Sequence, residues 1–513
     1  MKKLRSIISL VCAMALVLST CLTALTVTAE TKKTPIVAND FEGIVCYPSS
    51  LGSAAWGNNG QMDSDTGISE AGAHGGSKSV RFHSKDYGQQ YWIPSSENGT
   101  YVASPAIPNG DTKSYFIKFF YKANGFHFKV LARYVNSSGD QISPNVTMVD
   151  VTAGNEWNEY IGVVTIDPNS ALSAGDGYLQ FYVILDTSWK NAYIDDLEIY
   201  EINDGESIST VTYKESNGDV ISTVTDFAGT DLVLPKKYGY TAQLYTDSSF
   251  TAPYNSTVYP NENMDLYVKW IKTALLTNDF ESSVFYPSTI SANYAWKCDN
   301  TTYTSGISTN QASSPTHSLL IANNNQNNGS VSWIPSDANG NPVSSPDLAS
   351  GAKQSYYFKF NYRLSLGQIY IAAKLVDKTT GAAKTDTVRF LATYEHANNP
   401  SQIIVPLSED WRTYQGKIEL TANSAINADN TVLQIYVLFK YDDGASEQRS
   451  RLYLDDMEIY AMGADDVIST VTYKESNGSV ISTAKSLSGT DLALPEKYGY
   501  TAQLYTDSSF TAP

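Results

Sequence analysis

The sequence has few cysteines, little charge and almost no long hydrophobic runs. Four cysteines occur in 513 residues, and charged residues make up only 17% of the chain. Cys12 and Cys21 lie in the N-terminal segment, which leaves Cys46 and Cys298 for the remainder. The chain contains two copies of one segment, and Cys46 and Cys298 stand at non-equivalent positions of these copies. We therefore expect two free thiols, and domains that are stable without disulfides.

Positive charge is also in short supply. The chain has 35 Lys and Arg against 53 Asp and Glu, which gives a formal net charge of −18 at pH 7. A negative chain repels phosphate backbones, so the sequence predicts no nucleic-acid partner. The acidic residues are dispersed rather than collected in a tail, a pattern typical of a soluble surface.

Catalytic motifs are missing as well. The five histidines, His74, His83, His127, His317 and His396, show no metal-ligand spacing. The sequence has no G-x-S-x-G motif, P-loop or Cys/His set. These observations predict a protein that is not an enzyme, although a pair of acids for glycoside hydrolysis carries no sequence signature.

The single long apolar run is at the N-terminus. A basic MKKLR segment precedes IISLVCAMALVL, and Val27-Thr28-Ala29 offers a small-residue cleavage site. Residues 1–29 therefore read as a signal peptide. A lipid anchor at Cys21 is the alternative, which Thr20 before it disfavours. With no second run of spanning length, we expect no transmembrane segment in the mature chain, and a secreted or cell-envelope bacterial protein.

The chain is an internal duplication. Residues 208–253 and 468–513 are identical at 38 of 46 positions, and looser matches such as WIPS at 92–95 and 333–336 precede them. The order is A–B–A′–B′. Sandwich A spans 33–202, repeat B 203–272, sandwich A′ 273–462 and repeat B′ 463–513. B′ lacks a counterpart of 254–271, so we expect it to be incomplete.

The residue pattern predicts an all-β, multidomain protein. Aromatic residues reach 12% of the chain, and FHFKVLARYV at 126–135 alternates apolar and polar positions as a half-buried strand does. Many short strands separated by polar turns within about 170 residues favour a two-sheet sandwich. We expect A and A′ to be jelly-roll-like β-sandwiches.

The small units resemble the Listeria/Bacteroides repeat, also called the internalin B-type B repeat. The resemblance lies in these segments: TVTYKESNG (210–218), Leu-Pro (234–235), Tyr-Gly-Tyr (238–240), YTDSSFTAPY (245–254) and LYVKW (266–270). It implies a β-grasp-like fold, and a spacer or adhesion role on bacterial surfaces. Gln243 and Leu244 stand where the family usually has Gly-Trp, so no function of that Trp is carried over.

The large units resemble jelly-roll carbohydrate-binding modules of the family 4/9/22 kind. The matching segments in A are NDFE (39–42), HGGSKSVRF (74–82), the Trp157–Tyr160 strand and YIDDLEIY (193–200). A′ has NDFE and YLDDMEIY, but SPTHSLLI where HGGSKSVRF would stand. The resemblance implies a fold more than a ligand.

Recurring aromatic residues are the candidate ligand-binding groups. Trp157 and Trp411 start a strand, so we expect them in the core. The other recurring tryptophans precede or lie in polar loops, where an indole could stack on a sugar ring. The candidate ligand-binding residues are Trp56, Trp92, Tyr47, Tyr91, Trp296, Trp333 and Tyr286. The alternative is that these side chains cap the edge of the sandwich. Trp189 has no counterpart in A′.

Acidic residues recur at two places and are the candidate metal ligands. Asp40 and Glu42 open the first strand of A, and Asp195 and Asp196 lie in the last. Side chains of a strand alternate between its two faces, so Asp195 should lie on the same face as Tyr193. We expect this face to be the one that faces the core. Modules of the resembling kind often hold one structural Ca²⁺ near these positions. The candidate metal ligands are Glu42, Asp195, Asp196, Glu281, Asp455 and Asp456; the alternative is capped or solvated carboxylates.

The combined prediction is a surface-associated protein with non-catalytic, carbohydrate-binding-like modules spaced by adhesin-type repeats. Its partner would be a polysaccharide or surface glycan, because duplicated weak sites favour avidity. Two alternatives remain. One is a structural stalk or adhesin that binds a protein at the cell surface, and the other is the non-catalytic part of a larger glycoside hydrolase.

Overall fold

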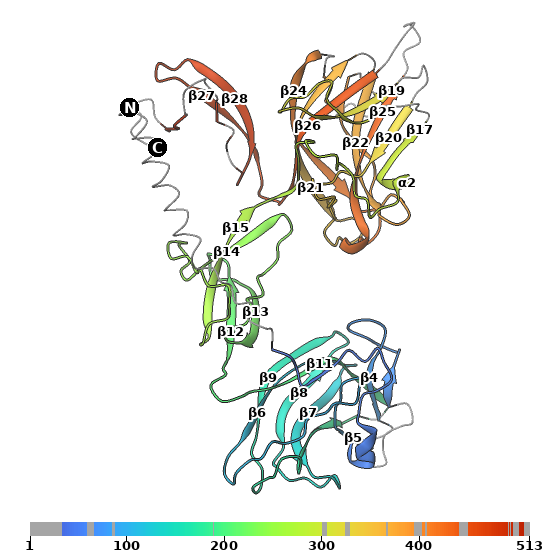
Figure 1. Cartoon of the computed structure of the whole chain (residues 1–513), viewed down its shortest axis with the longest axis vertical. Coiled ribbons are helices and arrows are strands. Elements are labelled where there is room, and N and C mark those ends of the chain that lie inside the picture. The colour runs from blue at the N-terminus through green and yellow to red at the C-terminus, as the bar shows by residue number, and fades with distance from the viewer. Residues whose placement is uncertain are drawn as a thin grey trace, which may run out of the picture. The chain divides into compact units, whose positions relative to one another are not determined.

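The structure is a computed structural model of the chain (Figure 1). It describes residues 33–58, 66–84, 88–187, 189–299, 305–323, 329–365, 368–393, 403–405, 408–440, 450–490, 492, 494–495 and 502–506. The expected signal peptide at 1–29 lies outside the described residues. Within the described ranges no helix is both long and apolar enough to cross a membrane.

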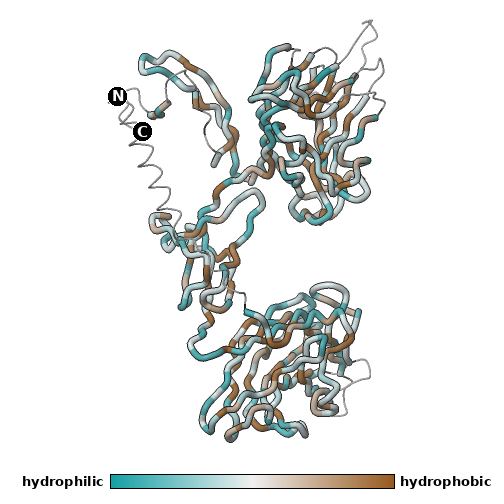
Figure 2. The backbone as a smooth tube through the Cα atoms, in the orientation of Figure 1, coloured by the Kyte–Doolittle hydropathy of each residue, from teal (hydrophilic) through white to brown (hydrophobic). Residues whose placement is uncertain are grey.

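The expected all-β, multidomain architecture is confirmed. The chain divides into two compact units, residues 1–234 with 244–268, and residues 235–243 with 269–513. Each unit contains one β-sandwich, and apolar and polar stretches alternate along the strands (Figure 2). The short helices described are η1 (Ser49–Ala54), α2 (Ala292–Ala295) and η2 (Ala428–Asn430).

Sandwich A packs two antiparallel sheets. The six-stranded sheet has the order β3-β4-β11-β6-β9, with β1 paired to β11, and the five-stranded sheet has the order β2-β5-β10-β7-β8. The six-stranded sheet contains β1 (Val37–Asn39), β3 (Gly67–Ser69), β4 (Ser79–Ser84), β6 (Lys113–Ala123), β9 (Asn158–Ile166) and β11 (Lys190–Glu201). The five-stranded sheet contains β2 (Trp56–Asn58), β5 (Gly88–Trp92), β7 (Phe126–Val135), β8 (Val146–Ala153) and β10 (Tyr178–Leu185).

Sandwich A′ repeats this topology strand for strand, with the orders β18-β19-β26-β21-β24 and β17-β20-β25-β22-β23 and with β16 paired to β26. The six-stranded sheet contains β16 (Ala274–Asn278), β18 (Gly306–Ser308), β19 (Ser318–Asn323), β21 (Lys353–Ser365), β24 (Ser408–Thr421) and β26 (Ser450–Met462). The five-stranded sheet contains β17 (Trp296–Asp299), β20 (Gly329–Trp333), β22 (Gln368–Asp377), β23 (Val388–Ala392) and β25 (Thr431–Lys440).

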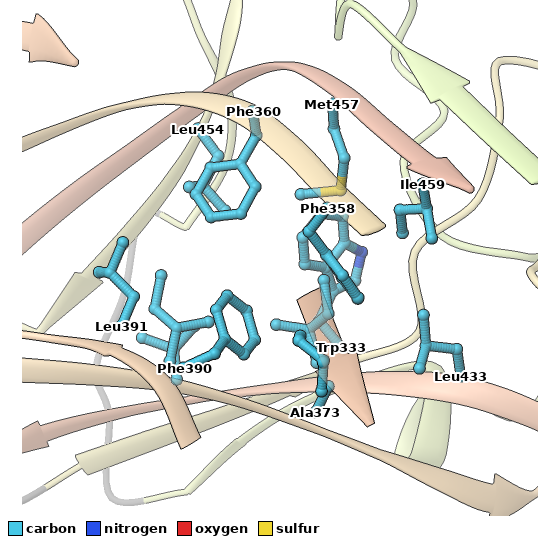
Figure 3. Close-up of a cluster of buried hydrophobic side chains, with 14 of the residues drawn as sticks. Trp333, Phe358, Phe360, Ala373, Phe390, Leu391, Leu433, Leu454, Met457 and Ile459 are labelled. Carbon is cyan, nitrogen blue, oxygen red and sulfur yellow. The ribbon is translucent and has the colours of Figure 1, made fainter. Parts of the chain in front are cut away.

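Each sandwich has its core between the two sheets, because alternate residues of facing strands point inward. In A′, Phe358 and Met457 of the six-stranded sheet point toward Trp333 and Leu433 of the five-stranded sheet (Figure 3). In A the equivalent core is built around Phe82, Trp92 and Phe181. Cys46 and Cys298 are not joined in a disulfide, as expected, and burial raises the pKa of the Cys46 thiol to about 12.

The small repeat B is a mixed four-stranded sheet in the order β13-β12-β15-β14, in which β12 and β15 run parallel. Its strands are β12 (Ile208–Lys214), β13 (Val220–Phe227), β14 (Tyr240–Tyr245) and β15 (Met264–Lys272). Val211, Tyr213, Leu266 and Val268 form its thin core. In B′ the described strands are the antiparallel pair β27 (Ile468–Lys474) and β28 (Val480–Leu487).

A lysine–carboxylate pair closes the base of each sandwich. Lys33, just before β1, pairs with Glu206, just after β11. Lys272, just before β16, pairs with Asp466, just after β26. The Lys272 side chain is 2% exposed and also donates to the Tyr240 hydroxyl at 2.7 Å. We call these two pairs the clasps.

Repeat B packs on one end of the outer face of A's six-stranded sheet. Phe116 and Tyr200 of A form a buried cluster with Phe227 of B. Lys118 of A pairs with Asp226 of B at 3.0 Å. The opposite end of that face is not covered by this contact.

Two expectations about the last strand and its neighbours are wrong. A bulge lies at Asp195 and Asp196, with Asp196 at φ 49°, and it reverses the alternation. Tyr193 therefore lies on the outer face, although Leu197 after the bulge faces the core. Trp157 is half-buried on the same outer face, where it contacts Tyr193, and does not belong to the core between the sheets.

Candidate functional site

Trp92 and Trp333 do not offer a binding surface, contrary to the expectation from their loop-like surroundings. Both are 0% exposed. The Trp92 indole N–H donates to the Cys46 carbonyl at 2.8 Å, and Trp333 donates to the Phe285 carbonyl at the same distance. Each is the last residue of a strand and points into the core, where its polar N–H is satisfied.

Trp56 and Trp296 are half-buried at the edge of the core. Trp56 stacks on Tyr47 at 5.2 Å and on Phe82 at 6.1 Å. Trp296 lies nearly parallel to Tyr286 at 6.4 Å. Trp56 has a stacked ring on each side, so its indole faces are not available to a sugar, which favours the alternative that Trp56 caps the sandwich edge. Tyr47, at 37% exposure, is the outermost member of the group.

Tyr91 belongs to a different surface, the outer face of the five-stranded sheet of A. Its ring is parallel to that of Tyr182 on the neighbouring strand, with an interplanar angle of 5° and centroids 5.2 Å apart. The Arg133 guanidinium lies 5.1 Å from the Tyr91 ring and 4.8 Å from the Tyr182 ring. We call these three residues the tyrosine platform.

Hydrogen bonds fix the Arg133 side chain of the tyrosine platform. Its Nε donates to Gln180 at 2.9 Å and an Nη donates to Gln141 at 3.0 Å. Gln180 in turn donates to the Ala54 carbonyl at 3.2 Å. Burial lowers the pKa of Arg133, but a guanidinium stays charged in proteins. The platform is therefore held in place before any ligand binds, which limits the entropy lost on binding.

Polar groups continue along the same face toward the start of β7 and the end of β10. His127 lies between two carboxylates, 2.7 Å from Asp150 and 2.8 Å from Asp186. Lys129 pairs with Asp150 at 2.9 Å. The face thus offers aromatic surface at one end and hydrogen-bonding groups at the other, which is the mixture that a sugar with apolar ring faces and polar rims requires.

Sequence reasoning named Tyr91 but missed Tyr182 and Arg133. The segment LQFYVIL looked like one continuous apolar run, which hides the side on which each residue lies. The signal was present in the register, because Tyr182 stands opposite Tyr91 and two residues from buried Gln180. Such a pairing is invisible until the strand order is known.

The equivalent face of A′ differs. Ser332 stands at the Tyr91 position and pairs with Tyr436, the counterpart of Tyr182. Lys374 replaces Arg133. In A′ the aromatic contact lies between β22 and β25, where the Tyr370 ring is 6.1 Å from the Tyr436 ring. The Arg389 guanidinium lies 4.6 Å from the Tyr370 ring.

The candidate metal ligands hold loops in place. The Glu42 carboxylate accepts hydrogen bonds from the Ser77 and Lys78 amides at 2.6 and 2.8 Å and from the Ser77 hydroxyl at 2.7 Å. Glu281 accepts equivalent bonds from Thr316 and His317. Hydrogen bonds from His317 and Thr316 lower the pKa of Glu281 to about 2.

The paired aspartates act in the same way. Asp195 accepts the His74 amide at 2.7 Å and the Asp196 amide at 2.9 Å. Asp455 accepts the Ser313 and Asp456 amides at the same distances. Burial raises the pKa of both Asp195 and Asp455 to about 6.

These contacts bear on the calcium prediction. A pocket of about 330 Å³ beside β1 is lined by four carboxylates, from Asp40, Glu97, Asp196 and Glu198. Asp196 is bound by His74 at 2.7 Å, Glu97 by the Gly43 amide and Glu198 by the Tyr200 hydroxyl, both also at 2.7 Å. Among the described residues no group of three or more His, Cys, Asp or Glu is placed to hold a metal ion. Calcium binding at these residues stays a prediction.

Comparison with known proteins gives fold similarity alone. No protein-family model matches the sequence, and no curated protein matches it. The resemblance of B to the Listeria/Bacteroides repeat thus gains no support.

Among solved structures, similar chains include carbohydrate-binding modules at low identity. A tandem of two family 22 modules from Paenibacillus barcinonensis is 11% identical, with a TM-score of 0.22, and the match covers 84% of this chain and 99% of that one. The C-terminal family 22 module of a Clostridium thermocellum protein is 20% identical at a TM-score of 0.22, covering 33% and 95%. A family 4 module is 14% identical at 0.19, covering 33% and 96%. At these scores the similarity does not extend to ligand or function.

Proposed function

We propose that the protein is a non-catalytic glycan-binding protein and that the tyrosine platform of sandwich A is its principal binding surface. The observation that carries the proposal is the parallel Tyr91–Tyr182 pair with Arg133 beside it. Aromatic rings pack against the C–H faces of sugars, and phenol, guanidinium and amide groups hydrogen-bond to hydroxyls.

The rest of the chain completes the proposal. Residues 1–29 act as an export signal, and B and B′ act as spacer repeats on a bacterial surface. A second, weaker surface in A′, around the half-buried Tyr436, adds avidity when both sandwiches bind the same polymer.

The test is titration of the full chain with neutral plant polysaccharides, xylan among them. Two stacked rings bury limited area, so we expect a dissociation constant of order 10 μM to 1 mM, or about 4 to 7 kcal/mol. Tyr182→Ala removes half of the aromatic pair and should weaken binding by about thirtyfold, or about 2 kcal/mol. Val163→Ala, at an exposed position of the other sheet, is the matched control and should leave affinity unchanged.

Two outcomes oppose the proposal. If no neutral glycan binds the full chain, A and A′ serve as structural modules of a stalk, and the search for a partner moves to cell-surface proteins. If glycans bind but Tyr182→Ala and Val163→Ala behave alike, binding occurs elsewhere on the molecule.

A further inference from the structure

The outer face of the six-stranded sheet of A carries a second aromatic surface, at the end that B leaves uncovered. We propose that this surface binds an acidic, carboxylate-bearing polysaccharide. The proposal is independent of the tyrosine platform, which lies on the other sheet.

Trp189 is the most exposed large aromatic residue of the surface. Its side chain is 67% exposed, and it follows β10 in the turn that leads into β11. Its backbone has φ 58°, a left-handed conformation that a bulky residue seldom adopts. The turn is nonetheless fixed, because the Trp189 amide donates to the Ser84 carbonyl at 2.7 Å. Strain that persists at an exposed indole is typical of a functional position.

The surface continues from Trp189 across neighbouring strands. The His83 ring lies 6.2 Å from the Trp189 ring. Arg81 lies two residues before His83 on β4. Arg81 and Lys122 are the residues directly opposite Tyr193 on the two neighbouring strands, β4 and β6. Tyr193 is 5% exposed, lies against Gly72 of the loop between β3 and β4, and supports the surface from beneath.

Trp157 closes the other end of the surface. Its ring is 6.4 Å from that of Tyr193, and the Lys122 ammonium lies 5.9 Å from the Trp157 ring. From Tyr193 to Lys190, the first residue of β11, is three residues of extended chain, about 10 Å at the usual rise per residue, and Trp189 lies one residue beyond. This length accommodates several sugar rings of a linear polymer.

The charge of the surface identifies the class of ligand. Arg81 and Lys122 flank Tyr193 in one cross-strand row, and the nearby Asp196 carboxylate is bound by His74 at 2.7 Å. Two cations about 10 Å apart, with aromatic rings at either end, suit a polymer that has carboxylates on rings with apolar faces.

A′ does not repeat the arrangement. Leu320 and Ala322 stand at the positions of Arg81 and His83, and they pack with Tyr453 beneath Trp411. The sequence at 441–449, which corresponds to the Trp189 turn, contains no tryptophan. The second surface is therefore specific to A.

The experiment titrates the full chain with polygalacturonate and, in parallel, with a neutral xylan. Polygalacturonate should bind, and binding should weaken as NaCl is raised because exposed ion pairs are screened. Arg81→Ser and Trp189→Gly should each weaken polygalacturonate binding by about tenfold. Tyr182→Ala should change xylan binding and leave polygalacturonate binding unchanged.

Trp189→Gly also separates binding from folding. Glycine adopts φ 58° without strain, so this variant should melt no lower than the wild type while losing affinity. A lower melting temperature with unchanged affinity would show that the indole is structural and would overturn the proposal. So would a failure of the wild type to bind polygalacturonate, or binding that neither Arg81→Ser nor Trp189→Gly weakens.

Discussion

Sandwiches A and A′ have the same strand order and the same buried tryptophan, yet their outer faces differ at nearly every contact that could bind a ligand. Trp92 and Trp333 make the same hydrogen bond at 2.8 Å. On the outer face, however, a tyrosine pair in A corresponds to Ser332 and Tyr436 in A′. Packing restricts inward positions, whereas outward positions are free to diverge after duplication.

The largest expected effect tests the shared framework. Trp92→Ala and Trp333→Ala should each destabilise their sandwich by about 3 to 5 kcal/mol, because each removes a fully buried indole and leaves a cavity. Urea denaturation of the full chain, followed by tryptophan fluorescence, would measure both. A small loss at either position would break the equivalence of the two cores.

The two clasps should differ more in their contribution to stability than the two buried tryptophans do. Lys272→Ala leaves Asp466 partly buried without its partner and should cost about 3 kcal/mol. The side chains of Lys33 and Glu206 are 21% and 33% exposed, so Lys33→Ala should cost less than about 1 kcal/mol. Equal losses in denaturation experiments would contradict the difference in burial.

Exchanging the residues at one outward-facing position of A and A′ should weaken glycan binding by A and strengthen it by A′. Tyr91→Ser gives A the residue that A′ has and should weaken glycan binding by about tenfold, or about 1.4 kcal/mol. Ser332→Tyr restores the missing ring beside Tyr436 and should strengthen binding in the Tyr91→Ser background. If the second change has no effect, the two faces differ in more than this pair.

A further expected effect is a pH dependence that both sandwiches share. Burial raises the folded-state pKa of Asp195 and Asp455 to about 6, above the ordinary value of 3.8. Folding favours the protonated carboxyl. The resulting contribution to the free energy of unfolding is complete below about pH 4 and is lost as pH rises through 6. Asp195→Asn cannot titrate and loses an acceptor, so it should be less stable than the wild type at pH 4, by a margin that narrows toward pH 7. A constant margin in melting temperature would contradict the shift.

The sequence predicted the all-β, multidomain fold because alternation and internal repetition are properties of the chain itself. The sequence analysis placed both Tyr91 and Trp92 on a binding surface, which the alternation of side chains along a strand does not allow. Tyr91 and Trp92 are adjacent in one strand, so only one of them can face outward. The bulge at Asp195 was beyond sequence reasoning, because a single left-handed residue reversed the faces of Tyr193 and Leu197. The tyrosine platform required the register of β5 and β10, which no local pattern contains.

The clasps have a mechanical consequence. In A the first strand lies antiparallel to the last, with Val37 opposite Ile199, so the chain enters and leaves the sandwich at the same end. Tension between the two ends would therefore peel β1 from β11 one residue pair at a time, the direction in which a sheet resists least. Lys33 and Glu206 sit at the fork where peeling would begin. Each clasp thus bears load before its sandwich does, and the more deeply buried clasp at Lys272 should make A′ the later of the two to open.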